Sequence, residues 1–126
     1  MDEFIWSSIK CYEMSFSKVY PHYLAKVEKK CRSQDELHKI VTWLTGYSET
    51  HLQEALNHQR SFKMFIETAP ALNPHRRLIT GSICGVRVEE ITEPLMQEIR
   101  YLDKMVDELA KGKPITSIMR KPAAER

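Results

Sequence analysis

The sequence contains no long apolar run, no closely paired cysteines and no strong excess of one charge. No stretch approaches the roughly 20 apolar residues of a membrane-spanning helix, so we expect no membrane partner. The first residues are acidic and lack both a basic and a long apolar segment, so we predict no signal peptide and a cytoplasmic location. The three cysteines are widely spaced without a Cys-x-x-Cys pair, which argues against a disulfide framework and a zinc site.

The net charge of +2 is too small to indicate a nucleic-acid partner. Two segments are nevertheless basic: residues 17–32 carry five basic and one acidic side chain, and residues 112–126 carry four basic and one acidic. A nucleic-acid binder would use as its phosphate track Lys18, Lys26, Lys29, Lys30 and Arg32, together with His75, Arg76 and Arg77 or the C-terminal tail. The near-neutral balance and the lack of a recognisable reading helix argue against such a partner.

A chain of 126 residues has the usual size of one domain and buries about two thirds of its unfolded surface. Its hydrophobic content of 42% and charged content of 29% are those of a globular protein, which excludes disordered and fibrous classes. We therefore predict a single domain over residues 1–126, with residues 1–11 and 122–126 flexible or peripheral.

Four helical segments are predicted in the first half of the chain, because apolar residues recur at helical spacing behind residues that cap helices. The first begins near Ser17 and carries Pro21 in its first turn, where proline is tolerated. The other three begin at serines, and the first of these forms a capping box with Glu36. Their predicted extents are Ser33 to Gly46, Ser48 to about Leu56, and Ser61 to a point before Pro70.

The segment after Asn73 fits two structures. Asn73 and Pro74 suit the start of a helix, and apolar residues then recur at helical spacing. Ile83–Val88 is instead rich in β-branched residues and fits a hairpin arm, but no Asn-Gly or Asp-Gly turn and no partner strand is evident. We favour a helix over residues 74–91, and leave open the choice between helix and strand for 83–88.

The longest predicted helix runs from Glu93 to Lys111, with Thr92 as its N-cap. Apolar residues alternate by four and three along one seam: Leu95, Ile99, Leu102, Val106 and Leu109. A second row broadens the apolar stripe and predicts spare surface for a partner: Met96, Tyr101 and Met105. A short last helix is predicted from Ile115 to Lys121.

Several phrases are distinctive in combination: Met14-Ser-Phe, Val19-Tyr-Pro21, Trp43-Leu-Thr-Gly-Tyr47, Leu72-Asn-Pro74, Ile83-Cys-Gly85 with Arg87-Val-Glu-Glu-Ile91, and Pro94-Leu-Met-Gln97 through Tyr101-Leu-Asp-Lys104 to Leu109-Ala-Lys-Gly112. Together they resemble a bacterial domain-of-unknown-function family, the one numbered twenty-two hundred, over about residues 12–121. The resemblance implies an all-α fold, a single-domain orthogonal helical bundle of about five or six helices, and supports the helical interpretation of 74–91. It implies no activity, so it assigns no catalytic residue.

Two glycines and a basic triplet suggest one candidate site. Gly81 and Gly85 are four residues apart, and a role in close helix packing is favoured over a role in ligand approach. If a ligand does approach, the residues best suit an anion at the helix start near Pro74. That anion would be bound beside free N–H groups by three side chains: His75, Arg76 and Arg77.

A second candidate site centres on Arg87 and Glu90. These residues fit either an ion-pair network between helices, which is favoured, or the polar lining of a pocket. In the pocket, aromatic walls would come from Trp43, Tyr47 and Tyr101, while Arg87 would hold an anionic ligand and Glu90 would be the acid or base.

The remaining reactive side chains have structural interpretations. Cys84 lies between apolar neighbours and is predicted to be a buried, unreactive thiol. His51, Glu54 and His58 share a helix face but complete no metal-binding motif, so a polar surface is favoured and no metal and no cofactor are predicted.

The favoured function is a small helical interaction or regulatory module that self-associates through the Leu95–Leu109 helix, and an enzyme is disfavoured. The alternatives are a small anionic-ligand binder or enzyme with a pocket near Arg87 and Glu90, and a weak nucleic-acid binder. The sequence does not identify a substrate, ligand or partner.

Overall fold

The computed structural model describes residues 15–58, 60–83 and 85–120. Helices dominate these residues, which confirms the all-α prediction, and the few strand residues form one small hairpin. The predicted peripheral segments 1–11 and 122–126 lie outside the described residues. The elements are α2 (Phe16–Glu28), α3 (Gln34–Thr45), α4 (Glu49–Asn57), α5 (Phe62–Glu67), the 3-10 helix η1 (Pro74–Leu78), β1 (Ser82–Ile83), β2 (Val86–Arg87), the 3-10 helix η2 (Val88–Glu90), α6 (Pro94–Ala110) and α7 (Ile115–Ile118).

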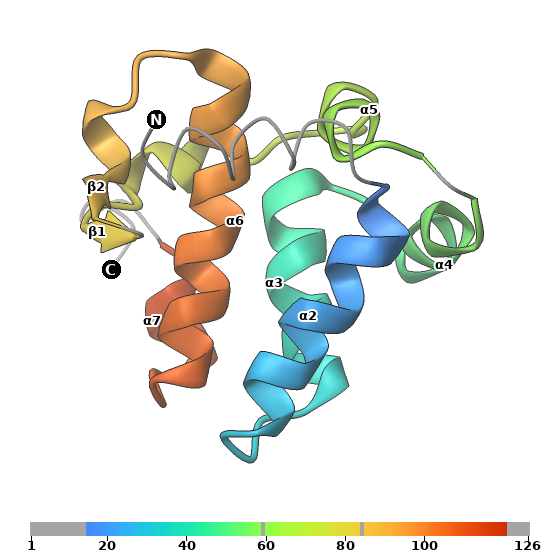
Figure 1. Ribbon diagram of the computed structural model, residues 1–126, viewed down its shortest axis with the longest axis horizontal. Helices are drawn as coiled ribbons and strands as arrows, with labels where there is room; N and C mark the ends of the chain where they lie inside the picture. The colour runs from blue at the N-terminus through green and yellow to red at the C-terminus, as the bar shows by residue number, and fades with distance from the viewer. Residues whose placement is uncertain (1–14, 59, 84, 121–126) are drawn as a thin grey trace.

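The central element is α6 (Figure 1). Helices α2 and α3 pack on one side of it, and the β1–β2 hairpin with η2 packs on another. In Figure 1, α2, α3 and α6 run roughly from top to bottom whereas α4 and α5 are seen nearly end-on, so the two groups of helices cross steeply. This arrangement agrees with the orthogonal bundle that the sequence resemblance implies.

Local capping signals fix the helix ends in the first half of the chain, as predicted. Ser33 and Glu36 form the capping box, in which the Glu36 N–H donates to the Ser33 Oγ at 3.2 Å. Ser48 and Ser61 accept main-chain hydrogen bonds at the starts of α4 and α5. Gly46 ends α3 with a φ of 78°, a left-handed conformation that glycine adopts at little cost.

The start of α2 depends on tertiary contacts instead. The helix begins at Phe16, so Pro21 is its sixth residue and lies in the second turn, not in the predicted first turn. The Phe16 N–H donates to the carbonyl oxygen of Arg60 at 2.8 Å, and the Phe16 ring stacks on that of Phe65 with centroids 3.8 Å apart. These contacts hold the first turn in place, although proline removes one main-chain hydrogen bond further along.

The predicted helix over residues 74–91 is wrong. Only η1 and η2 are helical there, and both are short 3-10 segments. Between them β1 and β2 pair as an antiparallel hairpin, which is the strand alternative for this segment. Gly81 and Gly85 have φ values of 110° and 79°, whereas an α-helix requires negative φ. The two glycines therefore serve turns, and the predicted role in helix packing does not apply.

The start of α6 also differs from the prediction by one residue. Its N-cap is Glu93 and not Thr92. The Glu93 carboxylate accepts from the N–H groups of Leu95 and Met96, at 3.3 and 2.7 Å. Since a carboxylate is favoured at the positive end of the helix dipole, Glu93 both satisfies these donors and stabilises the helix start.

Apart from Leu95, which is partly exposed in the first turn, both apolar rows of α6 are buried inside the domain. The seam residues Ile99, Leu102, Val106 and Leu109 are at most 1% exposed. The second row is buried as well, with Met96, Tyr101 and Met105 at most 4% exposed. The rows therefore leave no spare apolar stripe along α6, a helix that the structure describes in full. The sequence argument for self-association through Leu95–Leu109 loses its basis.

Candidate functional site

The five residues of the predicted Arg87–Glu90 pocket belong to three parts of the fold. Trp43 and Tyr47 lie at the end of α3, Tyr101 is buried on α6, and Arg87 and Glu90 belong to β2 and η2. Because α3 and the hairpin pack on different sides of α6, the structure does not gather these residues around one of its two described cavities.

Tyr47 has a clear structural role. It is 5% exposed, and its ring stacks on that of Phe65 with centroids 4.7 Å apart. Its hydroxyl donates to the carbonyl oxygen of Phe65 at 2.7 Å. Tyr47 therefore joins the end of α3 to α5 through both packing and a hydrogen bond.

Arg87 and Glu90 form a loose ion pair on the surface. The Arg87 Nε lies 4.0 Å from the Glu90 carboxylate, and the two side chains are 64% and 70% exposed. A second carboxylate, that of Glu89, lies 3.8 Å from the Arg87 guanidinium. Exposed ion pairs of this kind contribute little to stability because water and salt screen them.

Replacing Arg87 with alanine is therefore expected to change the free energy of unfolding by less than about 0.5 kcal/mol. Urea denaturation of the two proteins measures this difference. A loss of several times that amount would show that Arg87 holds the hairpin to the domain, as the predicted ion-pair network requires.

The predicted anion-binding triplet lies on η1. Asn73 caps this 3-10 helix by accepting from the His75 N–H at 2.9 Å. Arg76 is held from two directions: its Nε donates to Glu98 of α6 at 2.7 Å, and its Nη1 donates to the carbonyl oxygen of Asn73 at 2.9 Å. The Arg76 and Glu98 side chains are 14% and 11% exposed, so this pair ties η1 to α6 in a partly buried setting.

A cleft of about 540 Å³ opens beside the Arg76–Glu98 pair, between the end of α5, η1 and the first turns of α6. We call it the α5–α6 cleft. Its volume lies within the range of small-ligand sites, about 300–1,000 Å³. Apolar and charged residues share its lining: Ile66, Ala69, Leu72, Pro94 and Leu95 among the first kind, and Glu67, Arg76, Arg77, Glu93 and Glu98 among the second.

Arg77 is the exposed arginine of this cleft. Burial raises the pKa of the Tyr101 hydroxyl, and the nearby charge of Arg77 and a side-chain hydrogen bond with it act against that increase. Arg77 forms no ion pair with a carboxylate among the residues that the structure describes. The cleft therefore presents a guanidinium beside an apolar floor.

A second cavity, of about 440 Å³, lies between α3 and the start of α4. We call it the α3–α4 cavity. His38 lines it and is 5% exposed. One ring nitrogen of His38 lies 2.6 Å from the Glu49 carboxylate, and the other lies 2.5 Å from the Tyr20 hydroxyl. Gln34 also donates to that hydroxyl at 2.9 Å, so four side chains from three helices form one chain of hydrogen bonds.

The order carboxylate, imidazole, hydroxyl is that of a catalytic triad, but the environment does not activate the hydroxyl. Burial raises the pKa of Tyr20, whereas a nucleophile needs a lowered pKa or a base that can act on it beside the substrate. Tyr20 is 7% exposed and does not line the α3–α4 cavity. The network therefore fits a structural link between α2, α3 and α4.

Comparison with known proteins assigns the chain to a family. A model of the family described as "Uncharacterized protein conserved in bacteria (DUF2200)" matches residues 10–120. The chain belongs to this family. The crystal structure of the uncharacterized protein SP1917 is similar to this DUF2200 protein, with 46% sequence identity and a TM-score of 0.83 over 87% of this chain and 90% of that one. A comparison with curated proteins found no match.

The family resemblance of the sequence is thus confirmed, and neither comparison brings an activity with it. The described part of this DUF2200 protein contains no group of three or more His, Cys, Asp and Glu side chains that could hold a metal ion. Within the same residues no helix is long and apolar enough to cross a membrane. The predicted buried thiol Cys84 lies outside the described residues.

Sequence reasoning missed Glu98 and the Tyr20–His38–Glu49 chain. Glu98 lies 22 positions from Arg76, and Tyr20 lies 18 positions from His38. No local pattern signals such pairs, because each is made when separate helices pack together.

Proposed function

We propose that this DUF2200 protein is a small interaction module that binds a peptide segment of a partner protein in the α5–α6 cleft. The segment would carry an apolar side chain next to an acidic one. The observation that carries the proposal is the combination of an apolar floor with Arg77, a guanidinium that no described carboxylate neutralises.

The apolar floor would supply most of the binding free energy. It consists of side chains at the end of α5, in the loop before η1 and at the start of α6, among them the partly exposed Leu72 and Leu95. Covering such surface contributes about 25 cal/mol for each Å² removed from water. A single inserted apolar side chain of the partner would therefore contribute on the order of 1.5–3 kcal/mol.

The charged residues of the cleft would select the partner. Glu98 is neutralised by Arg76, and the Glu93 carboxylate is occupied by the N–H groups at the start of α6. Arg77 is then the group that favours a carboxylate on the ligand. Glu67 is a further acidic side chain that lines the same cleft. This arrangement also suits the predicted anionic ligand better than the surface pair Arg87–Glu90 does.

Self-association through α6 is not part of this proposal, because four of the five seam residues predicted to mediate it are in the core of the domain. A cytoplasmic location stays a prediction.

A phage-displayed random peptide library screened against the full chain tests the proposal. Selected peptides, synthesised with a fluorescent label, are expected to contain an apolar residue next to Asp or Glu. Arg77→Glu is expected to weaken their binding by at least about tenfold, equivalent to about 1.4 kcal/mol, as measured by fluorescence anisotropy.

Arg87→Glu is the matched control, because it makes the same charge reversal on an exposed arginine outside the cleft. The control should bind like the original protein. Failure to select any acidic–apolar peptide, or equal weakening by both substitutions, would overturn the proposal.

A further inference from the structure

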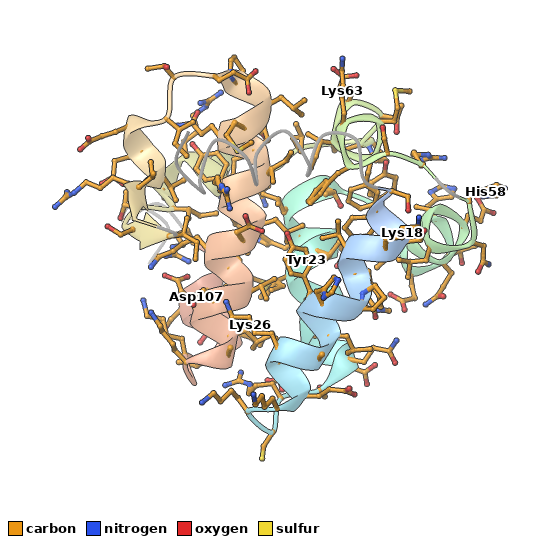
Figure 2. All side chains as sticks on the ribbon, in the orientation of Figure 1. Lys18, Tyr23, Lys26, His58, Lys63 and Asp107 are labelled. Atoms are coloured by element: carbon orange, nitrogen blue, oxygen red, sulfur yellow. The ribbon has the colours of Figure 1, made fainter. Side chains whose placement is uncertain are left out.

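The fold brings the last part of the basic segment 17–32 and the described part of the basic segment 112–126 together at one end of the molecule. Helices α2 and α6 run side by side and finish at the same end, where α7 also lies (Figure 1). Figure 2 shows Lys26 of α2 and Asp107 of α6 pointing toward each other, and their Nζ and Oδ1 atoms are 3.2 Å apart. We call residues 26–30 and 107–120 together the basic end.

Cations outnumber carboxylates at the basic end. Its segments carry six Lys and Arg residues against three Asp and Glu residues. Asp107 is shared by two lysines, Lys26 at 3.2 Å and Lys111 at 3.0 Å. Glu108 is likewise shared by Arg120 at 2.5 Å and Lys113 at 3.2 Å. Each carboxylate can neutralise one cation, so both clusters keep a positive charge.

The lysine side chains that carry the excess positive charge are exposed on the surface, where a large partner can contact them. The side chains of Lys26, Lys111 and Lys113 are 45%, 70% and 53% exposed, and Lys29 and Lys30 are exposed at the end of α2. Cations at helix C-termini are favoured by the helix dipole, which accounts for single lysines there. The dipole does not account for the two cations that each of these carboxylates receives from separate segments of the chain.

We propose that the basic end binds the phosphate backbone of a nucleic acid without reading its sequence. This surface is separate from the α5–α6 cleft, which lies at the opposite end of α6. The helix has 17 residues and therefore spans about 25 Å between the two. The proposal is independent of the peptide-binding function.

A nucleic acid fits this surface better than a protein partner does. Protein interfaces place apolar and aromatic residues at their centre and are depleted in lysine. The large hydrophobic side chains exposed in the described residues are Met64 and Leu78, and neither belongs to the basic end. Exposed lysines at this end can contact successive phosphates, and such contacts release condensed counterions and drive binding without base recognition.

The experiment measures binding of the full chain to a fluorescein-labelled DNA duplex of random sequence over a range of salt concentrations. The excess of three cations in the basic end predicts a slope of about −3 for the logarithm of the association constant against that of the salt concentration. The double variant Lys29→Gln/Lys30→Gln is expected to reduce the magnitude of this slope by about two.

The matched control is Lys18→Gln/Lys63→Gln, which removes the same charge from exposed lysines away from the basic end (Figure 2). The control should keep the original slope. The proposal is overturned if the duplex does not bind even at low salt, or if both double variants change the slope equally. It is also overturned if vesicles containing phosphatidylserine bind the protein more tightly than the duplex does, because a membrane surface would then be the partner.

Discussion

The variant Gly46→Ala is expected to lose about 3 kcal/mol of stability or more, a large part of the 5–15 kcal/mol that holds a typical domain together. Gly46 has a φ of 78°, and an L-residue other than glycine pays roughly 1–2 kcal/mol in this conformation. The atoms of Ala71 also leave no room for a side chain at this position. A Cβ atom at this position would lie 2.8 Å from the oxygen, 2.9 Å from the nitrogen and 2.9 Å from the Cβ of Ala71.

The backbone that Gly46 touches cannot easily move away. The Ala71 N–H donates to the carbonyl oxygen of Thr45 at 3.1 Å, and the Asn73 N–H donates to that of Leu44 at 2.9 Å. This loop therefore satisfies two carbonyls at the end of α3 that have no partner within the helix. Moving the loop to admit a methyl group would weaken both bonds, each of which contributes about 1 kcal/mol.

Gly112→Ala provides the control for the clash. Gly112 follows α6 with a φ of 95°, so it shares the conformational cost, but no atom lies within 4 Å of the position that its Cβ would occupy. We expect this variant to lose only about 1–2 kcal/mol in urea denaturation. Equal losses in the two variants would show that the contact with Ala71 is unimportant.

The variant Glu108→Gln is expected to lose about 3 kcal/mol at neutral pH, as is usual when one partner of a buried ion pair is removed. Glu108 is 3% exposed and receives a bidentate interaction from Arg120, with distances of 2.5 and 2.7 Å, and a further hydrogen bond from Lys113. Glutamine would leave the Arg120 side chain, which is 15% exposed, without a counter-charge. Thermal denaturation measures the effect, and the exposed Glu90→Gln serves as its control.

The stability loss caused by Glu108→Gln depends on pH, because the Glu108 carboxylate titrates. Burial alone would raise the pKa of Glu108, but hydrogen bonds and charge from Arg120 and Lys113 outweigh burial and hold it below its ordinary value of 4.5. A carboxylate with a lowered pKa in the folded state stabilises the protein above its unfolded-state pKa. That contribution is lost as the pH falls below about 4.5 and through the lower folded-state value. The stability difference between the original protein and Glu108→Gln should therefore shrink in acid; a difference that stays constant would contradict this role.

Helix boundaries were predictable where a boundary depends on residues close together in the sequence. The capping box of Ser33 and Glu36 spans one turn and forms as soon as that turn forms. Ser48, Ser61 and Gly46 act over equally short distances. The N-cap of α6 is Glu93 and not the predicted Thr92, which shows the limit of this reasoning: two adjacent polar residues can both cap a helix.

The segment 82–87 could not be assigned by periodicity, because short apolar runs fit helix and strand equally well. The decisive property was the backbone conformation of Gly81 and Gly85, which the residue type permits but does not require. A glycine tolerates both positive and negative φ, so the residue type alone did not exclude the helix-packing role that we favoured over ligand approach.

The candidate sites depend still more on the tertiary structure. The sequence singled out Arg76 and Arg77 as an anion site, and the fold places both in the α5–α6 cleft, where Glu98 takes up the charge of Arg76. Only the packing of η1 on α6 shows that Arg77 is the arginine left for a ligand. A ligand role for Trp43, Tyr47, Arg87, Glu90 and Tyr101 stays a prediction without a common cavity to support it.

The sequence by itself determined the all-α class and most helix ends, because these follow from patterns repeated over one or two turns. It also determined the family, through phrases spread over most of the chain. The tertiary structure decided which apolar rows are buried, which charges are neutralised and where parts of the two basic segments meet. These outcomes depend on contacts between residues far apart in the chain, such as Lys26 with Asp107, and only the packing of whole helices brings such residues within reach of each other.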